Sequence, residues 1–151
     1  MALSLVKQIE LIPAAPFDFD STFHKPDHFT SGDNFWEPGT RWQTWRWCRE
    51  PLGLAFRNAG TVDAPRVIVD CYHSRPLDEA SVDALAAEIR YAYNFDLDLS
   101  DFYRTFEGDP VLGPVLRRWR GMRPGHPSSL YEYLIIGIVL QNATIRRSIQ
   151  M

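Results

Sequence analysis

Apolar and polar residues alternate with period two in several stretches of the first half of the chain. This alternation predicts a strand at residues 17–23, entered after two prolines. Further strands are predicted at residues 40–48, 52–57 and 66–72, because turn-forming Gly, Asn, Asp and Pro residues separate these stretches. Residues 24–38, rich in proline, glycine and aromatic residues, are expected to form a loop. The pattern predicts an antiparallel meander of three or four strands.

The spacing of apolar residues changes after residue 77. Over residues 78–94 they recur at intervals of three and four, and acidic residues occupy the first turn, which predicts an amphipathic helix. The apolar positions are Val82, Leu85, Ala86, Ile89 and Tyr93. Because strands come first and helices follow, the sequence predicts an α+β fold, an antiparallel sheet backed by helices.

Two shorter helices are predicted next in the chain. The first covers residues 97–106, with Ser100 as its N-cap, and the second covers residues 109–119. Pro110 is tolerated because it falls in the first turn of the second helix. Pro114 is expected to kink or break that helix.

The most apolar stretch lies near the end of the sequence. Between residues 130 and 140 the only charged residue is Glu132, and apolar positions surround the whole helical circumference. Ser129 and Glu132 have capping-box spacing. The run is shorter than the roughly 20 residues of a membrane span, so we predict a core helix and no membrane association. Another part of the protein must cover such a helix, and we expect the sequence to be truncated after it.

The composition fits a folded domain. The 151 residues are 45% hydrophobic and include five tryptophans, enough for the core of one domain or of a small domain plus part of a second. The N-terminus lacks the continuous apolar run of a signal peptide, so we expect a cytoplasmic protein.

Charge is unevenly distributed along the chain. The net charge is −3, yet residues 1–100 carry nine Lys and Arg against fifteen Asp and Glu, whereas residues 101–151 carry seven Arg against four acidic residues. A basic C-terminal third is compatible with a nucleic-acid partner. The alternative is that Arg117, Arg118 and Arg120 are simply the solvated side of a helix.

The cysteines and histidines form no metal or redox motif. Cys48 and Cys71 lack CxxC spacing and are expected to be reduced core thiols. His24 and His28 are four residues apart, but Pro26 between them disfavours the helix that would place both on one face. We therefore predict no metal site and no cofactor.

Three tryptophans lie in the predicted strand at residues 40–48. Trp42 falls on one face and Trp45 and Trp47 fall on the other, so the strand needs a bulge or two apolar faces. Such rings can stack on nucleic-acid bases, but in a short sheet they more often pack against a helix. They also support an alternative function: a stand-alone α+β binding module whose Trp-lined sheet holds a small ligand or a protein partner.

Three segments of the C-terminal third resemble a known enzyme family. They are FDLDLSDFYRTF, the loop GMRPGHP and the helix end IVLQNATIRR. The stretch that contains them is similar to the start of the helical core of the helix-hairpin-helix (HhH-GPD) DNA glycosylases, nearest the 8-oxoguanine and 3-methyladenine branch. The resemblance implies that residues 1–95 form a sheet domain similar to half of the TATA-binding protein. Residues 96–151 would be the first helices of an all-α core, with the missing C-terminal helical domain in cis.

The resemblance also implies double-stranded DNA as the partner and removal of a flipped, damaged purine, 8-oxoguanine or an alkylated base. Asn142 matches the family asparagine that contacts the unpaired partner base, and Gln141 lies beside it. An amide offers both a donor and an acceptor to a base edge. Arg146 and Arg147 are expected to approach phosphates. Without the resemblance, hydrogen bonding at a helix end explains the two amides equally well.

The catalytic groups of this family have no counterpart in residues 1–151. The family uses a hairpin with a Leu-Pro-Gly-Val-Gly-like sequence, a downstream Asp and, in members with lyase activity, a Lys nucleophile. The only lysines here are Lys7 and Lys25, both far upstream of the predicted core. The chain by itself is therefore not expected to break a glycosidic bond.

Overall fold

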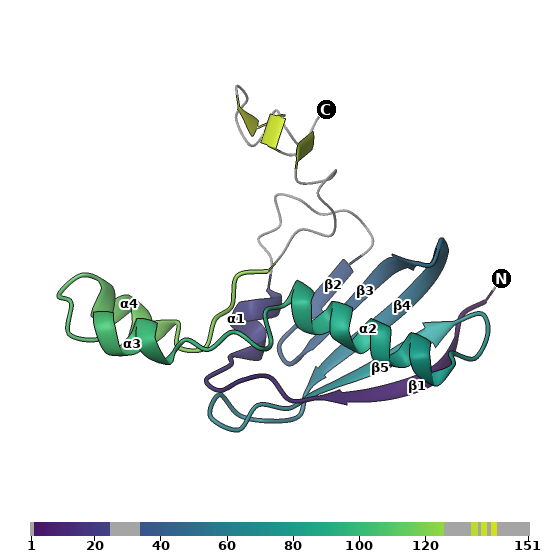
Figure 1. Cartoon of the computed structure of the whole chain (residues 1–151), viewed down its shortest axis with the longest axis horizontal. Helices are drawn as coiled ribbons and strands as arrows, with labels where there is room; N and C mark the ends of the chain where they lie inside the picture. The colour runs from purple at the N-terminus through teal and green to yellow at the C-terminus, as the bar shows by residue number, and fades with distance from the viewer. Residues whose placement is uncertain (1, 25–33, 126–133, 136, 139, 142–151) are drawn as a thin grey trace.

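The computed structural model describes residues 2–24, 34–125, 134–135, 137–138 and 140–141. Within these residues the fold is α+β, and an antiparallel sheet is its largest element (Figure 1). The strands are β1 (Ser4–Leu11), β2 (Asn34–Glu37), β3 (Thr40–Trp47), β4 (Glu50–Asn58) and β5 (Val67–His73). The helices are α1 (Phe19–Phe23), α2 (Glu79–Ala92), α3 (Ser100–Phe106) and α4 (Leu112–Arg118).

The five strands lie in the order β1-β5-β4-β3-β2, and every neighbouring pair is antiparallel. The predicted meander is confirmed in β3, β4 and β5. β2 extends it where only a loop was expected, because residues 34–37 pair with β3. β3 keeps one register with β4 along its whole length, so its tryptophans use both faces and no bulge occurs between these two strands.

β1 was not predicted from the sequence. It pairs with β5 at one edge of the sheet, where Ile9 lies opposite Val69 and contributes to the core. The register between the two strands shifts between Leu5 and Lys7. Such an irregularity interrupts the period-two alternation that would otherwise mark a strand.

The predicted strand at residues 17–23 is wrong, because α1 forms there. Asp18 is the N-cap, and its carboxylate accepts hydrogen bonds from the backbone N–H of Ser21 (2.7 Å) and from the Ser21 hydroxyl (2.6 Å). Phe19 and Phe23 lie one turn apart and stack with ring centroids 4.4 Å apart. A local cap and a helical aromatic pair therefore prevail over the alternating pattern.

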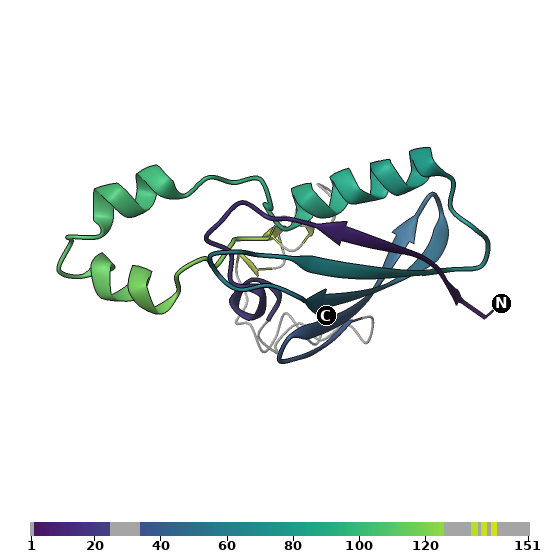
Figure 2. The same ribbon diagram turned by 90° about the horizontal axis from the view of Figure 1, so that it is seen from below.

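α2 covers one face of the sheet, as Figure 1 shows and as the layered view of Figure 2 confirms. The predicted amphipathic helix is correct: Leu85 and Ile89 are fully buried, and Asp78 caps the helix by accepting from the Ser81 N–H (2.7 Å). The sheet contributes mainly aliphatic residues to the same core, and α1 contributes aromatic ones. The buried apolar residues from outside α2 include Ile9, Leu11, Phe17, Phe19, Phe23, Leu52, Leu54, Phe56, Val67, Val69, Cys71, Tyr93 and Phe95.

α3 and α4 form a helical hairpin that extends to one side of the sheet in Figure 1. Both helices were predicted, but Ser100 is not the N-cap of α3, since Leu99 holds that position without a side-chain bond. Pro114 does not break α4, because it lies in the first turn, where a missing N–H costs little. Val111 is the N-cap and makes no side-chain bond, but Asp109 just before it accepts from the N–H groups of residues 111 and 112 (both 2.8 Å).

Candidate nucleic-acid interface

Gln141 is the only one of the four predicted DNA-contacting residues that lies within the described part of the chain. It is exposed, and its backbone N–H donates to the carbonyl oxygen of Ile138 (3.3 Å) at the end of a helical segment. Asn142, Arg146 and Arg147 lie outside the described residues. The exposed amide of Gln141 is accessible to a partner molecule.

The apolar helix predicted before Gln141 is described at residues 134–135, 137–138 and 140. All of them are helical and exposed, and Ile138 shows 66% of its surface to solvent. Full burial of each aliphatic side chain would stabilise the fold by roughly 1.5–3 kcal/mol, and an exposed side chain does not make this contribution. No described helix is both long and apolar enough to span a membrane. Among the described residues nothing covers this surface.

The arginines at the C-terminal end of α4 differ in their partners. Arg120 pairs with Asp63 (2.5 Å), and the hydrogen bond from Arg120 lowers the pKa of that carboxyl. Arg117 and Arg118 have no carboxylate within salt-bridge distance in the described part of the chain. Arg118 lies over the ring of exposed Trp119, 5.7 Å from its centroid. Cations at a helix C-terminus also stabilise the helix, so this position has a structural reason besides any contact with an anion.

Arg123 is a deeply buried cation, with only 2% of its surface exposed. Its guanidinium donates to the carbonyl oxygens of Leu97, Ala14 (2.8 Å) and Pro16 (3.0 Å). Its backbone N–H donates to the Thr22 hydroxyl oxygen (3.1 Å). Burial lowers the pKa of Arg123, and the carbonyl oxygens replace the water that would otherwise solvate its charge. One side chain thus joins the β1–α1 connection to the α2–α3 connection.

The residues on either side of Arg123 are held at the same place. The Gly121 N–H donates to the Tyr103 hydroxyl oxygen (2.8 Å), and the Gly121 carbonyl oxygen accepts from the Asp18 N–H (2.8 Å). The Pro124 carbonyl oxygen accepts from the Asn94 side chain (2.6 Å). Gly121 has a φ of +88°, and a Cβ added there would lie 2.6 Å from the Asp18 nitrogen. Glycine is therefore required at this crossing.

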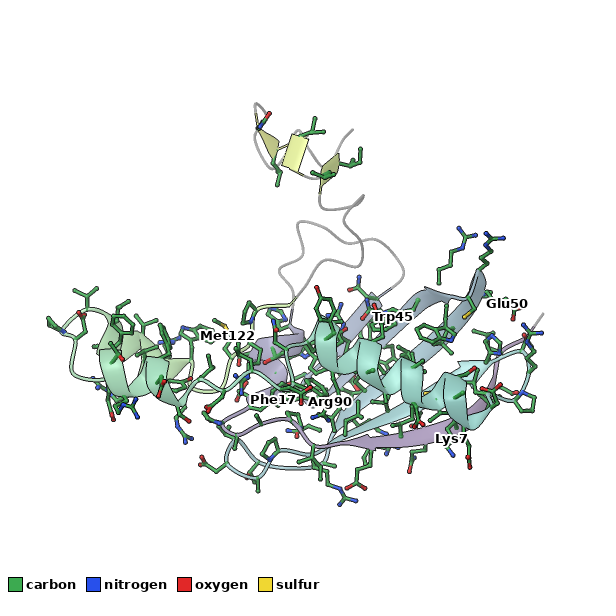
Figure 3. All side chains as sticks on the ribbon, in the orientation of Figure 1. Lys7, Phe17, Trp45, Glu50, Arg90 and Met122 are labelled. Carbon is green, nitrogen blue, oxygen red and sulfur yellow. The ribbon has the colours of Figure 1, made fainter. Side chains whose placement is uncertain are left out.

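We call residues 121–124 the clasp. Figure 3 labels Met122 within the clasp and Phe17 on the segment before α1, and both lie near α1. In the sequence the clasp comes before the predicted apolar helix and Gln141. Among the described residues, it holds the chain that follows α4 against the segment that leads into α1.

A second buried cation lies within the core. Arg41 is 4% exposed, and its guanidinium donates to the carbonyl oxygen of Phe23. Nearby, the Tyr93 hydroxyl donates to the Gln43 side-chain oxygen (2.6 Å). Burial raises the pKa of Tyr93 to about 12, although the charge of Arg41 partly opposes this shift. Tyr93 is thus neutral at physiological pH and serves the core as a hydrogen-bonding group.

An aromatic groove lies on the sheet face opposite α2. Trp42 and Phe35 are exposed there with ring centroids 5.5 Å apart, and Gly53 is among the residues that line a groove of about 350 Å³. Trp45 and Trp47 instead pack against the core, on the α2 side. The three tryptophans of β3 therefore do not share one surface. Packing is confirmed for Trp45 and Trp47, and only Trp42 contributes to the groove.

Cys48 and Cys71 are both free thiols. Cys71 is buried as expected, and burial raises its pKa to about 11, with a further contribution from the charge of Asp70. Cys48 is exposed in the turn between β3 and β4 with a φ of 48°, so the prediction of a core position was wrong for this residue. The described residues contain no group of three or more His, Cys, Asp and Glu placed to hold a metal ion.

Neither Arg123 nor Phe35 was singled out as functional from the sequence. Arg123 lies in a loop, where no hydrophobic periodicity reports burial, and guanidinium groups are usually exposed. Phe35 fell in a stretch expected to be a loop because Pro, Gly and Asp surround it. The loop at residues 121–127 is one of the segments that resemble the HhH-GPD family, but nothing in its sequence indicated that Arg123 is buried.

The fold has a counterpart among solved structures. It is similar to that of a 3-methyladenine DNA-glycosylase from Archaeoglobus fulgidus, with a TM-score of 0.69 at 13% sequence identity. The match covers 93% of this chain and 47% of that protein, so the chain spans about half the length of this structural relative. No protein-family model matches the chain, and no curated protein matches its sequence. At this identity the likeness establishes a common fold.

Proposed function

We propose that this chain is the N-terminal part of a base-excision-repair DNA glycosylase that flips and removes a damaged purine, either 8-oxoguanine or an alkylated base. The observation that carries the proposal is the fold similarity to a DNA glycosylase over 93% of the chain. Because a fold alone does not determine chemistry, the choice of function also depends on the three segments that resemble the HhH-GPD family.

In this proposal the chain contributes two parts of the enzyme. Residues 1–95 form the sheet domain, similar to half of the TATA-binding protein, and residues 96–151 begin the all-α core. The exposed apolar residues of the helix before Gln141, together with Val111 and Val115 on the α3–α4 hairpin, support this division. Such residues need a cover, and the C-terminal helical domain would supply it along with the hairpin, Asp and Lys of catalysis.

DNA contact is assigned to the end of the apolar helix. Asn142 and Gln141 would hold the base left opposite the flipped purine, since amides match base edges in both donor and acceptor. Arg146 and Arg147 would contact phosphates and set the salt dependence of binding. Double-stranded DNA is the partner, no cofactor is required for hydrolysis of the N-glycosidic bond, and the cytoplasmic location stays a prediction.

The direct test is base release by the longer polypeptide that contains this chain followed by its C-terminal helical domain. Duplexes with a single 8-oxoguanine or a single 3-methyladenine are incubated with this protein, and free base is quantified. Residues 1–151 alone serve as the control and should release none. Release of either base supports the proposal, whereas a folded complete protein that releases neither contradicts it.

The aromatic groove favours a second candidate function, a binding module for a small apolar ligand or a protein partner. The observation behind it is that Trp42 and Phe35 remain exposed beside Gly53 on a face that no described helix covers. Single apolar residues on a surface are common, but a groove lined by several is a typical binding feature. Quenching of tryptophan fluorescence by an apolar dye, abolished by Trp42→Ala and unaffected by Trp119→Ala, would support it.

A further inference from the structure

The sheet face opposite α2 carries a row of different side chains along β3. Because side chains alternate between the two faces of a strand, Thr44 and Arg46 share this face with Trp42. Phe35 on β2 lies opposite Trp42, and the centroids of the two rings are 5.5 Å apart with an angle of 36° between the ring planes. An aromatic pair, a hydroxyl and a guanidinium therefore follow one another along one strand.

Gly53 forms the floor of the aromatic groove. In the register of the sheet it lies between Thr44 on β3 and Tyr72 on β5. These two strands are about 10 Å apart, so the missing side chain at Gly53 leaves a flat gap between two rows of side chains. The groove has a volume of about 350 Å³, and Tyr72 and Leu3 belong to its lining. A planar ring system fits a space of this size, since small-molecule sites begin at about 300 Å³.

The polar groups around the groove provide hydrogen bonding and positive charge. Among the described residues, the hydroxyls of Thr44 and Tyr72 have no hydrogen-bond partner. Arg46 is exposed and has no carboxylate within salt-bridge distance in the described part of the chain. The described residues that line the groove itself carry no charge. A ligand of the groove can therefore combine an uncharged planar part with an anionic group.

The acidic residues on this face do not oppose such a ligand. Asp70 is largely buried and pairs with Arg57 (2.9 Å), so its charge is compensated. Glu37 lies at the end of β2, opposite the first residue of β3, whereas Arg46 is near the other end of β3. The end of the groove nearest Arg46 is therefore complementary to an anion.

We propose that the aromatic groove binds a single-stranded nucleic acid, with a base stacked on Trp42 above Gly53 and a neighbouring phosphate on Arg46. Unpaired bases of any sequence stack on exposed aromatic side chains, and arginine binds the phosphates that join them. A duplex does not fit the groove in this way, because its bases are stacked on one another. The site is separate from the proposed glycosylase chemistry, since its residues all belong to the sheet, and it replaces the apolar ligand or protein partner of the second candidate function with a nucleic acid.

The test measures binding of a labelled oligothymidylate to the complete protein by fluorescence anisotropy over a range of salt concentrations. Trp42→Ala removes the stacking ring, Trp42→Phe keeps a smaller ring, and Arg46→Met removes the cation. Trp119→Ala and Arg118→Met are the matched controls, because they make the same changes at an exposed tryptophan and an exposed arginine at the end of α4. An abasic strand of equal length and a duplex are the comparison ligands. Each variant is measured at a temperature where circular dichroism shows it folded.

The expected results separate stacking from charge. Trp42→Ala should lower the affinity for the oligothymidylate at least about fivefold, the smallest loss expected for one stacked base, and Trp42→Phe should lose less. Neither change should alter binding of the abasic strand or of the duplex. Arg46→Met should reduce the slope of log affinity against log salt by about 0.7, the value for one phosphate of a single strand. Both control variants should bind the oligothymidylate as the wild type does.

Several results would overturn the proposal. They are a wild-type protein that does not bind the oligothymidylate, wild-type affinity in Trp42→Ala, equal loss of duplex affinity in that variant, and an unchanged salt slope in Arg46→Met. An apolar dye that binds the groove when the oligothymidylate does not would instead assign the groove to a small apolar ligand. Should Trp42→Ala fail to fold, Trp42→Phe and the salt slope of Arg46→Met decide. Base release is measured separately, so a failure of the glycosylase proposal and a failure of this site are distinguishable.

Discussion

Arg41 and Arg123 are buried cations whose guanidinium groups bond to backbone carbonyl oxygens. In each case the Nε atom has no partner among the described residues, so the fold accepts an incompletely satisfied charge at two places. Removing one group from such an arrangement leaves carbonyl oxygens without a donor, which costs about 1–3 kcal/mol for each buried group. These residues therefore fix geometry, because their guanidinium groups bond to backbone segments that lie far from them in the sequence.

Gly121 gives a prediction with a matched control. Gly121→Ala should destabilise the protein by at least about 2 kcal/mol, because the new Cβ would meet backbone atoms of the segment before α1 in a conformation that is already unfavourable for alanine. Gly39→Ala has a similar φ of +79° but no atom within 4 Å, so it should cost only about 1 kcal/mol. Urea unfolding of the two variants measures the difference. Equal losses would show that the clasp tolerates a side chain.

The buried thiol of Cys71 should make the free energy of unfolding depend on pH in the alkaline range. Burial raises its pKa from 9.0 to about 11 in the folded state. Between these values the unfolded chain releases a proton that the folded chain keeps, so the free energy of unfolding falls as the pH rises from 9 towards 11. Cys71→Ala should have a smaller fall over the same range in urea unfolding experiments. A variant with the same pH dependence as wild type would contradict this assignment.

Asn142 is the residue on which DNA recognition is proposed to depend. In the complete protein, Asn142→Ala should weaken binding to a lesion duplex by about 1–3 kcal/mol and reduce the preference among opposite bases, since it removes one pair of base-edge hydrogen bonds. Competition binding with four duplexes that differ only in the opposite base measures both effects. Ser148→Ala, six residues further along, is the control. A uniform loss of affinity on all four duplexes would contradict a base contact.

At the scale of elements, predictions from the sequence succeeded where periodicity and burial agree. α2 was predicted because its apolar stripe faces the core, and β3 to β5 were predicted because turn residues separate them. The sequence did not reveal β1, whose register shifts between Leu5 and Lys7. At α1 it misled, because three buried phenylalanines at alternating and helical spacing fit both a strand and a helix. There the hydrogen bonds from Ser21 to the Asp18 carboxylate favour the helix. The alternation of apolar and polar residues gives no information about such bonds.

The N-cap of α1 can be tested by itself. Asp18→Ala should destabilise the protein by about 1 kcal/mol, because the Ser21 N–H at the start of the helix loses its acceptor. Asp18→Asn retains an oxygen acceptor at the same position and should cost much less. Chemical denaturation measures both. If the two substitutions had the same effect, the charge of Asp18 and not its capping bond would be responsible.

At the scale of the whole molecule, the chain combines a well-buried sheet layer with helices whose apolar surfaces stay exposed. The core beneath α2 is closed by aliphatic and aromatic residues, whereas Val111, Val115 and the residues before Gln141 face solvent. The sequence indicated this contrast through a helix that is apolar on every side. It did not indicate the clasp, because contacts between distant loops leave no periodic signal. A partly covered molecule of this kind fits the proposal that a C-terminal helical domain completes the fold.

The most direct test of the central claim is single-turnover release of base from a lesion duplex by this chain joined to its C-terminal helical domain. We expect release of free 8-oxoguanine or free 3-methyladenine, no release by residues 1–151 alone, and slower release after Asn142→Ala. A complete, folded protein that releases neither base would contradict the proposed function.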